Sequence, residues 1–270
     1  MERYVSFLVD LLERARVRLL REWRGERGVV GVNVKGDETR GFDFRVEEYL
    51  VREIRGRWGR VGFFAEEEGE VEGEAPFFVL DPVDGSTNFL RRVGVCSISV
   101  AVAEEPYLES ARVGVVKNVL SGETYHAVKG GGAFLDGVPI APSNTVSLDG
   151  AVVGVDLDFP DKEDLRKVLP LMLRARKIRK VGSNALEISY VAHGGYDAFV
   201  DVRNLLTCES FLAAKVILEE AGGKVTDERG APIRGEIRLE KKWNIIAAAN
   251  STLHGEILAV LRGGRVPLRF

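Results

Sequence analysis

Two aspartates separated by two residues lie in the segment Asp81-Pro82-Val83-Asp84-Gly85-Ser86-Thr87-Asn88-Phe89. The segment follows the apolar run at residues 77–80, which is typical of a buried strand. Carboxylates at the end of such a strand can bind a hard cation such as Mg²⁺, which prefers oxygen ligands. The amides and hydroxyls after Gly85 can open a helix, whose N-terminus attracts anions. The segment therefore predicts a site where a metal and a phosphate meet, and the alternative is an ordinary capped turn made from the same residue types.

An acidic run, Glu66-Glu67-Glu68, follows a second apolar pair just upstream. If the two strands are neighbours, their ends bring three carboxylates together. Such a group suits Mg²⁺, which usually keeps waters and shares phosphate oxygens with the substrate. The alternative is a solvated loop, the usual place of charge blocks, and it is retained for Glu70, Glu72 and Glu74.

Together the two segments resemble the paired signature of the inositol monophosphatase family, the Mg²⁺-dependent sugar-phosphate phosphatases. Similar landmarks occur at residues 129–137, 181–187, 220–223 and 246–250, so the resemblance spans nearly the whole chain. It points to the archaeal-type inositol monophosphatase/fructose-1,6-bisphosphatase branch. The implied fold is a layered αβαβα sandwich with α+β and α/β halves. The implied cofactor is Mg²⁺, about two or three ions, with Mn²⁺ as a substitute.

The resemblance implies that Glu67, Asp81 and the backbone carbonyl of Val83 bind a first metal ion, and that Asp81 and Asp84 bind a second. The family's Glu-Glu pair is matched here to the second and third glutamates of the acidic run. This match assigns the role to Glu67, and Glu66 is the neighbouring alternative. All of these ligands are oxygen donors, as Mg²⁺ requires.

The same resemblance assigns the phosphate to the turn after the aspartates. The amides of Gly85, Ser86 and Thr87 would hold its oxygens. The Ser86 hydroxyl would orient the attacking water, Glu67 would accept its proton, and Asp84 is assigned a catalytic part beside its metal role. This chemistry needs no covalent intermediate, because metals and positioning stabilise the charge that develops on the phosphate.

A charged, glycine-flanked segment at residues 34–43 is typical of a mobile loop. The family has its metal-coupled loop here. The resemblance thus implies that Asp37 and Thr39 approach a third metal or its nucleophilic water, and that Asp43 supports the site. A solvated connector is the alternative for Asp37 and Thr39.

One position departs from the family pattern. The family has an aspartate at the start of the helix that leads to Glu220, and counting back ten residues gives Ser210. Counting forward nine residues from Asp201 gives the same position, so a register slip does not explain the difference. A neutral serine oxygen would bind the second metal more weakly than a carboxylate, and the neighbouring Glu209 is a candidate to compensate. Alternatively, Ser210 is only a helix N-cap.

Substrate selection is expected from the second half of the chain. The resemblance implies that Asp201 accepts hydrogen bonds from substrate hydroxyls, that Ser183 and Asn184 receive other hydroxyls through their backbone, and that Arg179 lies near the leaving group. Each residue has a plainer alternative. Arg179 belongs to a basic run that suits a helix surface, and Asp201 can simply pair with Arg203.

Two amphipathic helices are predicted at residues 3–24 and 44–57, with Asp43 as the N-cap of the second. Several strands follow the acidic turn, and Asp136-Gly137 closes a hairpin. From residue 143 strands alternate with helices, including helices at 162–174 and 210–221, which indicates α/β structure.

The chain is therefore expected to form two subdomains. Residues 1–142 would be an α+β subdomain that carries the metal motifs, and residues 143–270 an α/β subdomain that completes the substrate site. The site is expected in the cleft between them, since such clefts are favoured ligand sites.

Composition narrows the classes of partner. The chain has 270 residues, 45% of them hydrophobic, which is enough for a real core. A net charge of −3 gives no reason to expect nucleic acid or an anionic membrane as a partner, and no apolar run approaches the ~20 residues that span a bilayer. Cys96 and Cys208 are too few for a disulfide framework. A charged N-terminal helix in place of a signal peptide predicts a cytoplasmic protein, and the family habit predicts a homodimer.

Three functions compete on the sequence alone. The first is Mg²⁺-dependent hydrolysis of inositol 1-phosphate, and with it fructose 1,6-bisphosphate, by attack of a metal-activated water. The second is a nucleotide phosphatase of the 3′-phosphoadenosine or NADP type, which Asn88-Phe89 disfavours because such relatives depart from the family there. The third is a non-catalytic binding or scaffold protein with an impaired metal site, suggested by Ser210. The first predicts a small phosphorylated polyol or sugar as the partner.

Overall fold

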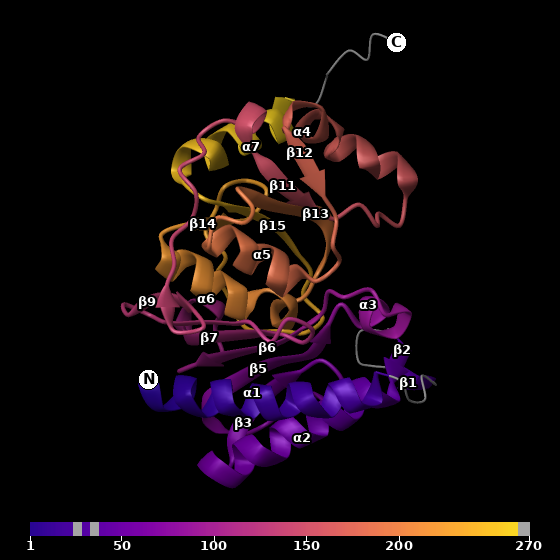
Figure 1. Cartoon of the computed structure of the whole chain (residues 1–270), viewed down its shortest axis with the longest axis vertical. Coiled ribbons are helices and arrows are strands. Elements are labelled where there is room, and N and C mark those ends of the chain that lie inside the picture. Colours follow the sequence, from indigo (N-terminus) through magenta and orange to yellow (C-terminus); the bar gives the residue numbers. More distant parts are fainter. Residues whose placement is uncertain (24–28, 33–37, 264–270) are drawn as a thin grey trace.

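The computed structural model describes residues 1–23, 29–32 and 38–263 of the chain. Its elements stack in five layers (Figure 1). Helices α1 (Glu2–Glu22) and α2 (Gly41–Trp58) form the first layer, and a sheet of eight strands forms the second. Helices α5 (Asn184–Ala192) and α6 (Leu212–Ala221) lie between this sheet and a second sheet of five strands. Helices α4 (Leu169–Arg174) and α7 (Ser251–Gly263) cover the far side, which confirms the predicted αβαβα sandwich.

The eight-stranded sheet has the order β10-β9-β8-β7-β6-β5-β3-β4. Only β3 and β5 run parallel in it, while the other neighbours are antiparallel. The predicted hairpin at Asp136-Gly137 is confirmed between β9 and β10. The strands are β3 (Val61–Ala65), β4 (Gly69–Val71), β5 (Glu74–Asp84), β6 (Ser97–Ala103), β7 (Ala111–Asn118), β8 (Thr124–Val128), β9 (Gly132–Leu135) and β10 (Val138–Pro139). A separate pair, β1 (Val29–Val32) and β2 (Glu38–Arg40), precedes α2.

The second sheet has the order β12-β11-β13-β15-β14. Its strand β11 runs parallel to both β12 and β13, as expected for alternating strands and helices. The strands are β11 (Val152–Val155), β12 (Lys177–Arg179), β13 (Ala198–Leu206), β14 (Lys224–Thr226) and β15 (Trp243–Ala248). Short 3₁₀ turns precede several elements, namely η1 (Leu108–Ser110), η2 (Leu148–Gly150), η3 (Lys162–Lys167) and η4 (Cys208–Ser210).

Helix boundaries differ from the predictions at three points. Helix α2 begins at Gly41, so Asp43 lies buried in its first turn and the prediction of Asp43 as the N-cap is wrong. The helix predicted at residues 162–174 is divided into η3 and α4, because Pro170 suits the first turn of a helix and not its interior. Helix α6 begins at Leu212 with Phe211 as its N-cap, so Ser210 does not cap it and instead ends η4.

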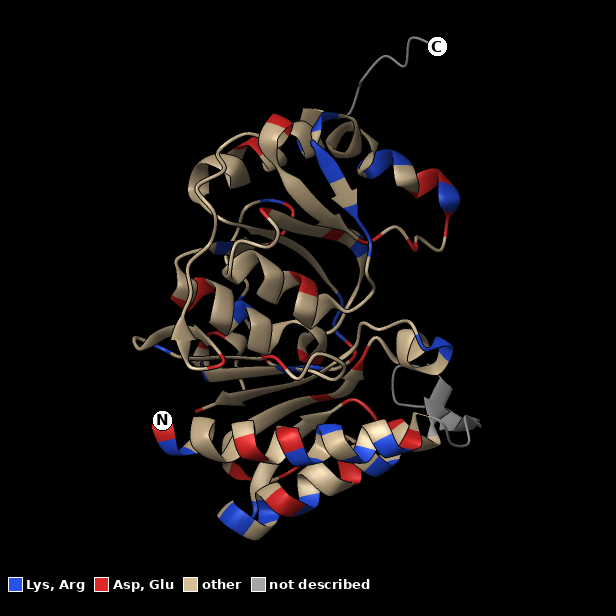
Figure 2. Cartoon of the chain, viewed as in Figure 1, with Lys and Arg blue, Asp and Glu red and all other residues tan. Residues whose placement is uncertain are grey.

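The middle helices join the two sheets closely. A Cβ on Gly114 of β7 would lie 2.2 Å from the Ala213 carbonyl oxygen of α6, so only glycine permits this approach. One continuous core contains Phe64 and Val79 of the first sheet together with apolar residues of α5 and α6. Figure 2 shows many charged residues on α1 and α2, at the outside of the molecule. The division into subdomains at residue 142 stays a prediction, and the core extends across it.

None of the helices in the described ranges is both long and apolar enough to span a bilayer.

Candidate active site

The ends of β3 and β5 lie side by side, as the sequence predicts. Ala65 pairs with Leu80 in the parallel ladder, and the Glu66 amide donates a hydrogen bond to the Leu80 carbonyl at 3.2 Å. Glu66 therefore continues the ladder next to Asp81. Carboxylates from two strands thus reach the same edge of the sheet, which is the arrangement expected of a metal-binding pair.

Side-chain alternation distinguishes Glu66 from Glu67. Phe64 on β3 and Val79 on β5 belong to the core on the α5–α6 side of the sheet. Because side chains alternate along a strand, Glu66 and Asp81 follow on that same side. By the same alternation Glu67 follows Ala65, which belongs to the core on the α1–α2 side, and the Glu67 amide donates to the carboxylate of Glu47 on α2 at 2.9 Å. The register thus favours Glu66 over the predicted Glu67 as the partner of Asp81.

The turn that carries these glutamates is held by a buried acid. Glu47 is fully buried, and its two carboxyl oxygens accept the amides of Glu67 at 2.9 Å and Glu68 at 2.6 Å. Burial raises the pKa of Glu47 to about 8, and the nearby Glu67 and Glu66 carboxylates add to this rise against the two amide hydrogen bonds. The side chain anchors the β3–β4 turn from behind.

Asp84, at the end of β5, binds the start of α5. Its carboxylate accepts hydrogen bonds from the hydroxyls of Ser183 at 2.6 Å and Ser97 at 3.1 Å, and from the amides of Ala185 at 2.9 Å and Asn184 at 3.1 Å. Burial raises its pKa to about 6, although these hydrogen bonds lower it. Ser183 and Asn184 are thus next to Asp84, at the junction of the two halves.

The turn after Asp84 has the geometry predicted from its residues. Gly85 has φ +88°, in the left-handed region, and a Cβ there would also lie 2.9 Å from the Gly182 carbonyl. Helix α3 (Ser86–Arg91) begins directly after it. The Asn88 side-chain amide donates to the carbonyls of Val95 at 2.9 Å and Val181 at 2.7 Å, which fixes the turn against the second half.

Asp81 is buried, and its Oδ1 accepts the Val83 amide at 3.2 Å. The donors at this edge are carboxylate and carbonyl oxygens, and their chemistry fits Mg²⁺. Among the described residues, however, no group of three or more histidine, cysteine, aspartate or glutamate side chains converges on a single point as metal ligands do. The donor types and the strand register support a metal site, while the full ligand set is not assembled.

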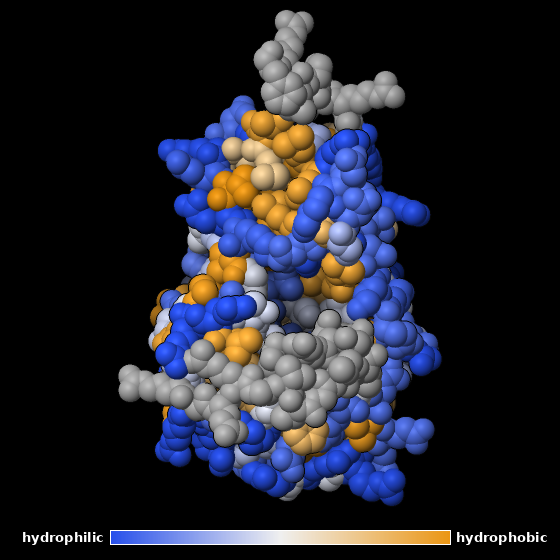
Figure 3. Space-filling view, turned by 90° about the vertical axis from the view of Figure 1, so that its right-hand side faces the viewer, coloured by the Kyte–Doolittle hydropathy of each residue, from blue (hydrophilic) through white to orange (hydrophobic). Residues whose placement is uncertain are grey.

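A cavity of about 430 Å³ opens beside the turn. One side is formed by residues 85–88 and Val93, and the other by Asp156, Asp158, Lys180 and residues 181–182. Both halves of the chain contribute to it. Figure 3 views the side of the molecule on which α3 lies, where the surface is mostly hydrophilic and a recess opens near its middle.

Five charged side chains form a chain of ion pairs beside this cavity. Lys180 Nζ lies 2.8 Å from Asp158 and 3.4 Å from Asp156, and the Arg203 guanidinium lies 2.9 Å from Asp156 and 2.6 Å from Asp201. The Lys180 contact lowers the pKa of Asp158. Burial lowers the pKa of Lys180, but the two carboxylates outweigh it and raise that pKa overall. The cavity therefore has a charged wall.

Asp201 and Arg179, which are both predicted to lie near the substrate, have different surroundings in the structure. Asp201 is fully buried and accepts hydrogen bonds from Arg203 Nε at 3.0 Å and Nη2 at 2.6 Å, so the plainer alternative for Asp201 is observed. Arg179 is exposed on the edge strand β12, and its Nη1 donates to the Ile178 carbonyl. It does not line the cavity, and the next residue, Lys180, does.

A sequence pattern indicates the carboxylates of this cavity wall. Asp156 and Asp158 follow the apolar strand β11, in the same way as the first pair of aspartates follows β5. Parallel strands bring their carboxyl ends to one edge, so this second pair was a reasonable candidate.

Glu209 and Ser210 lie at the start of the segment that leads into α6. Glu209 is buried, and its carboxylate accepts hydrogen bonds from the Thr207 hydroxyl and the Cys208 thiol, the latter at 3.7 Å. Ser210 is half-buried, and its amide donates to the Thr207 carbonyl. A buried carboxylate is thus available beside the position where the family has aspartate.

The structure describes little of the predicted metal-coupled loop. Asp37 lies outside the described residues, and Thr39 is described only by its backbone in β2. Their predicted roles stay predictions.

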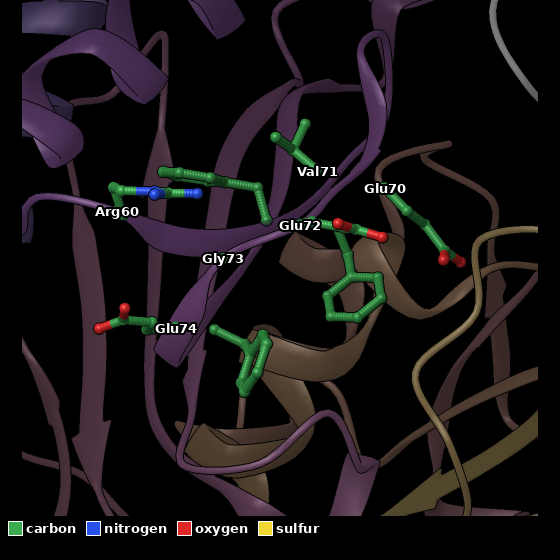
Figure 4. Close-up of a pocket in the computed structure, with 9 residues that line it drawn as sticks. Arg60, Glu70, Val71, Glu72, Gly73 and Glu74 are labelled. Carbon is green, nitrogen blue, oxygen red and sulfur yellow. The ribbon is translucent and has the colours of Figure 1, made fainter.

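A larger cavity lies elsewhere on the molecule. It has about 480 Å³ and is formed around β4, with Phe64 and Phe77 among its lining and Glu70, Glu72 and Glu74 at its border (Figure 4). It contains none of the predicted site residues. Volume alone therefore does not identify the active site here.

Comparison with known families matches residues 1–264 to the model of the inositol monophosphatase family. The chain belongs to this family. Membership confirms the resemblance inferred from the two motifs. Enzymes of the inositol monophosphatase family are metal-dependent phosphatases that generally use Mg²⁺.

Individual relatives of the inositol monophosphatase family agree with this placement. The chain is 37% identical over 245 residues to the fructose-1,6-bisphosphatase/inositol-1-monophosphatase of Methanothermobacter thermautotrophicus, covering 86% of each protein. It is 33% identical to the inositol-1-monophosphatase of Aeropyrum pernix, over 82% of this chain and 84% of that protein. It is also 31% identical to a bifunctional NADP phosphatase/NAD kinase of Methanococcus maripaludis, over 90% of this chain but 46% of that protein.

A solved structure with this fold is the extragenic suppressor protein from Bartonella henselae. It superposes with a TM-score of 0.87 at 26% identity, covering 97% of this chain and 99% of that one. The five-layer arrangement is therefore shared with the family.

Proposed function

We propose that this protein is a Mg²⁺-dependent phosphomonoesterase that hydrolyses inositol 1-phosphate, with fructose 1,6-bisphosphate as a second candidate substrate. The observation that carries the proposal is the edge where Glu66 continues the β3 ladder beside Asp81 and where Asp84 leads into the Gly85 turn. Relatives with these two activities in their names support the substrate class.

The residues proposed to hold the first metal are Glu66, Asp81 and the Val83 carbonyl, and Asp81 with Asp84 would hold the second. When bound, Mg²⁺ would lower the pKa of a water and neutralise charge on the phosphate oxygens. Asp84 already holds the start of α5 through its hydrogen bonds, so its position is fixed before any metal binds.

The other residues of the turn bind and orient the substrate. The amides of Gly85, Ser86 and Thr87, at the start of α3, are proposed to hold phosphate oxygens. The Ser86 hydroxyl orients the attacking water, and Glu66 accepts its proton. Gly85, Ser86 and Thr87 lie on one short turn, so the phosphate is positioned with little loss of freedom in the protein.

Glu209 is proposed to stand in for the aspartate that the family has at position 210. Its carboxylate is buried one residue away, and its extra methylene group extends its reach. The second metal would then bind more weakly than the first, because Ser210 supplies at most a neutral oxygen.

A test of the function is phosphate release in the presence and absence of Mg²⁺. The panel contains inositol 1-phosphate, fructose 1,6-bisphosphate, 3′-phosphoadenosine 5′-phosphate and NADP. We expect release from inositol 1-phosphate that stops on chelation, and we expect Asp81→Asn to lower kcat/KM by about 100-fold or more. Asp149→Asn, at an exposed aspartate, is the matched control. Absence of release from every substrate would refute the proposal.

A nucleotide phosphatase is the second candidate, because of the NADP phosphatase named among the relatives. The same panel separates the two functions. We do not retain the scaffold alternative, since the relatives are named as phosphatases. A homodimer and a cytoplasmic location stay predictions from the sequence, and light scattering at micromolar concentration tests the first.

A further inference from the structure

The wall of the cavity beside the phosphate turn is more negative than positive. The described residues that line it include two carboxylates, Asp156 and Asp158, and one cation, Lys180. The ion-pair chain behind the wall adds Arg203 and Asp201, which cancel each other. The five groups thus sum to a single negative charge.

The cations of this wall are already engaged. Arg203 is largely buried between Asp156 and Asp201, with a side chain only 10% exposed, and both of its carboxylate partners are buried. Lys180 is 30% exposed and has two carboxylate neighbours. A second phosphate that entered the cavity would meet no unpaired cation among the described lining residues. To bind Lys180, this phosphate would have to displace the carboxylate of Asp156 or Asp158.

We propose that this wall selects substrates with a single phosphate on an uncharged polyol, and that Asp158 sets the selection by holding Lys180. The proposal rests on the phosphomonoesterase function above and specifies its substrate class. The proposal predicts a higher kcat/KM for inositol 1-phosphate than for fructose 1,6-bisphosphate or dinucleotide phosphates. The latter two substrates carry a further anionic group.

Asp158 is the member of the wall that can be changed without opening the core. Its side chain is 70% exposed, while that of Asp156 is 6% exposed. Asp158 also lies outside the phosphate turn and the proposed metal ligands. Removing its charge lets the Lys180 ammonium bind an anionic group of the substrate, because among the described residues Asp156, at 3.4 Å, is then its one remaining carboxylate partner.

The experiment compares kcat/KM for inositol 1-phosphate and fructose 1,6-bisphosphate in the wild type and Asp158→Asn. We expect the wild type to prefer inositol 1-phosphate. In Asp158→Asn the value for fructose 1,6-bisphosphate itself should rise about fivefold or more, through KM, as removal of one like charge near a dianion predicts. The value for inositol 1-phosphate should change less than about twofold, and the gain should shrink at about 1 M salt.

Two further variants make the result specific. Asp164→Asn removes an equivalent exposed partner of Lys167, also at 2.8 Å, which does not line this cavity, and it should leave both substrates unchanged. Lys180→Met added to Asp158→Asn should remove the gain for fructose 1,6-bisphosphate, because Lys180 is the group that would receive the second phosphate.

The outcomes separate this inference from the proposed function. Hydrolysis of inositol 1-phosphate with no gain for fructose 1,6-bisphosphate in Asp158→Asn overturns the inference alone. A wild type that prefers fructose 1,6-bisphosphate also overturns it. A wild type that hydrolyses neither substrate refutes the function on which the inference rests.

Discussion

At the scale of the residue, the choice between Glu66 and Glu67 has the greatest chemical consequence. Both are glutamates of the same turn, yet Glu66 continues the ladder beside Asp81 while the Glu67 amide binds Glu47. A carboxylate shares a metal with Asp81 only if it lies on the same side of the sheet. The strand register supplies that information, and a motif match with an ambiguity of one residue does not.

We predict that Glu66→Gln lowers kcat/KM for inositol 1-phosphate by about 100-fold or more and raises the Mg²⁺ concentration needed for half-maximal activity. Glu67→Gln keeps the backbone amide bound to Glu47, and it should lower kcat/KM by less than about tenfold. Steady-state kinetics over a Mg²⁺ titration measures both. The reverse order of effects would return the ligand role to Glu67.

The prediction that Arg179 lies near the leaving group also depends on a one-residue assignment. Arg179 is on β12 and exposed, and its neighbour Lys180 lines the cavity. Because successive side chains along an extended chain point to opposite sides, a displacement of one residue decides which basic group faces the cavity. The type of charge could be read from the sequence, but its direction could not.

At the scale of the element, the β3–β4 turn depends on α2. The turn contributes glutamates to the proposed site, but its amides are held by Glu47, which belongs to the preceding helix. No short motif links these two positions. The dependence becomes visible only when α2 is packed against the sheet.

We predict that Glu47→Ala lowers the free energy of unfolding by about 2–4 kcal/mol, because it leaves two partly buried amides without their acceptor. It should also lower activity, since the turn loses its support. Glu48→Ala, at the exposed neighbouring position, should change the free energy of unfolding and the activity by little. Denaturant unfolding and phosphate-release assays test this, and equal stabilities of the two variants would contradict it.

At the scale of the whole molecule, the two halves are joined through the middle layer of helices. Helices α5 and α6 come from the second half of the chain, yet they share a core with Phe64 and Val79 of the first sheet. Asp84 and Asn88 add polar contacts from the first half to residues 181–185. We therefore expect the chain to unfold as one cooperative unit.

Gly114 offers a test of this junction. Gly114→Ala places a Cβ within 2.2 Å of a backbone oxygen of α6, and it should lower the free energy of unfolding by about 2 kcal/mol or more. Gly56→Ala, on α2 with open space around it, should instead raise the free energy by about 0.5–1 kcal/mol, because glycine is unfavourable in a helix. Each substitution should shift the midpoint of a single urea unfolding transition, Gly114→Ala to lower and Gly56→Ala to higher urea concentration. Two separate transitions would show that the halves are independent.

The family, the five-layer fold and the oxygen-donor chemistry of the turn at residues 81–89 could all be predicted from the amino-acid sequence. The family and the fold follow from the resemblance of the motifs, and the donor chemistry follows from the residue types in the turn. The packing of the folded chain placed Glu66 beside Asp81, brought Lys180 to the cavity, and linked the wall residues Asp156 and Asp158 to Lys180 and Asp156 to Arg203 behind them. The physical reason is that strand register and the packing of the two sheets decide which side chains meet, and both depend on contacts between residues far apart in the chain.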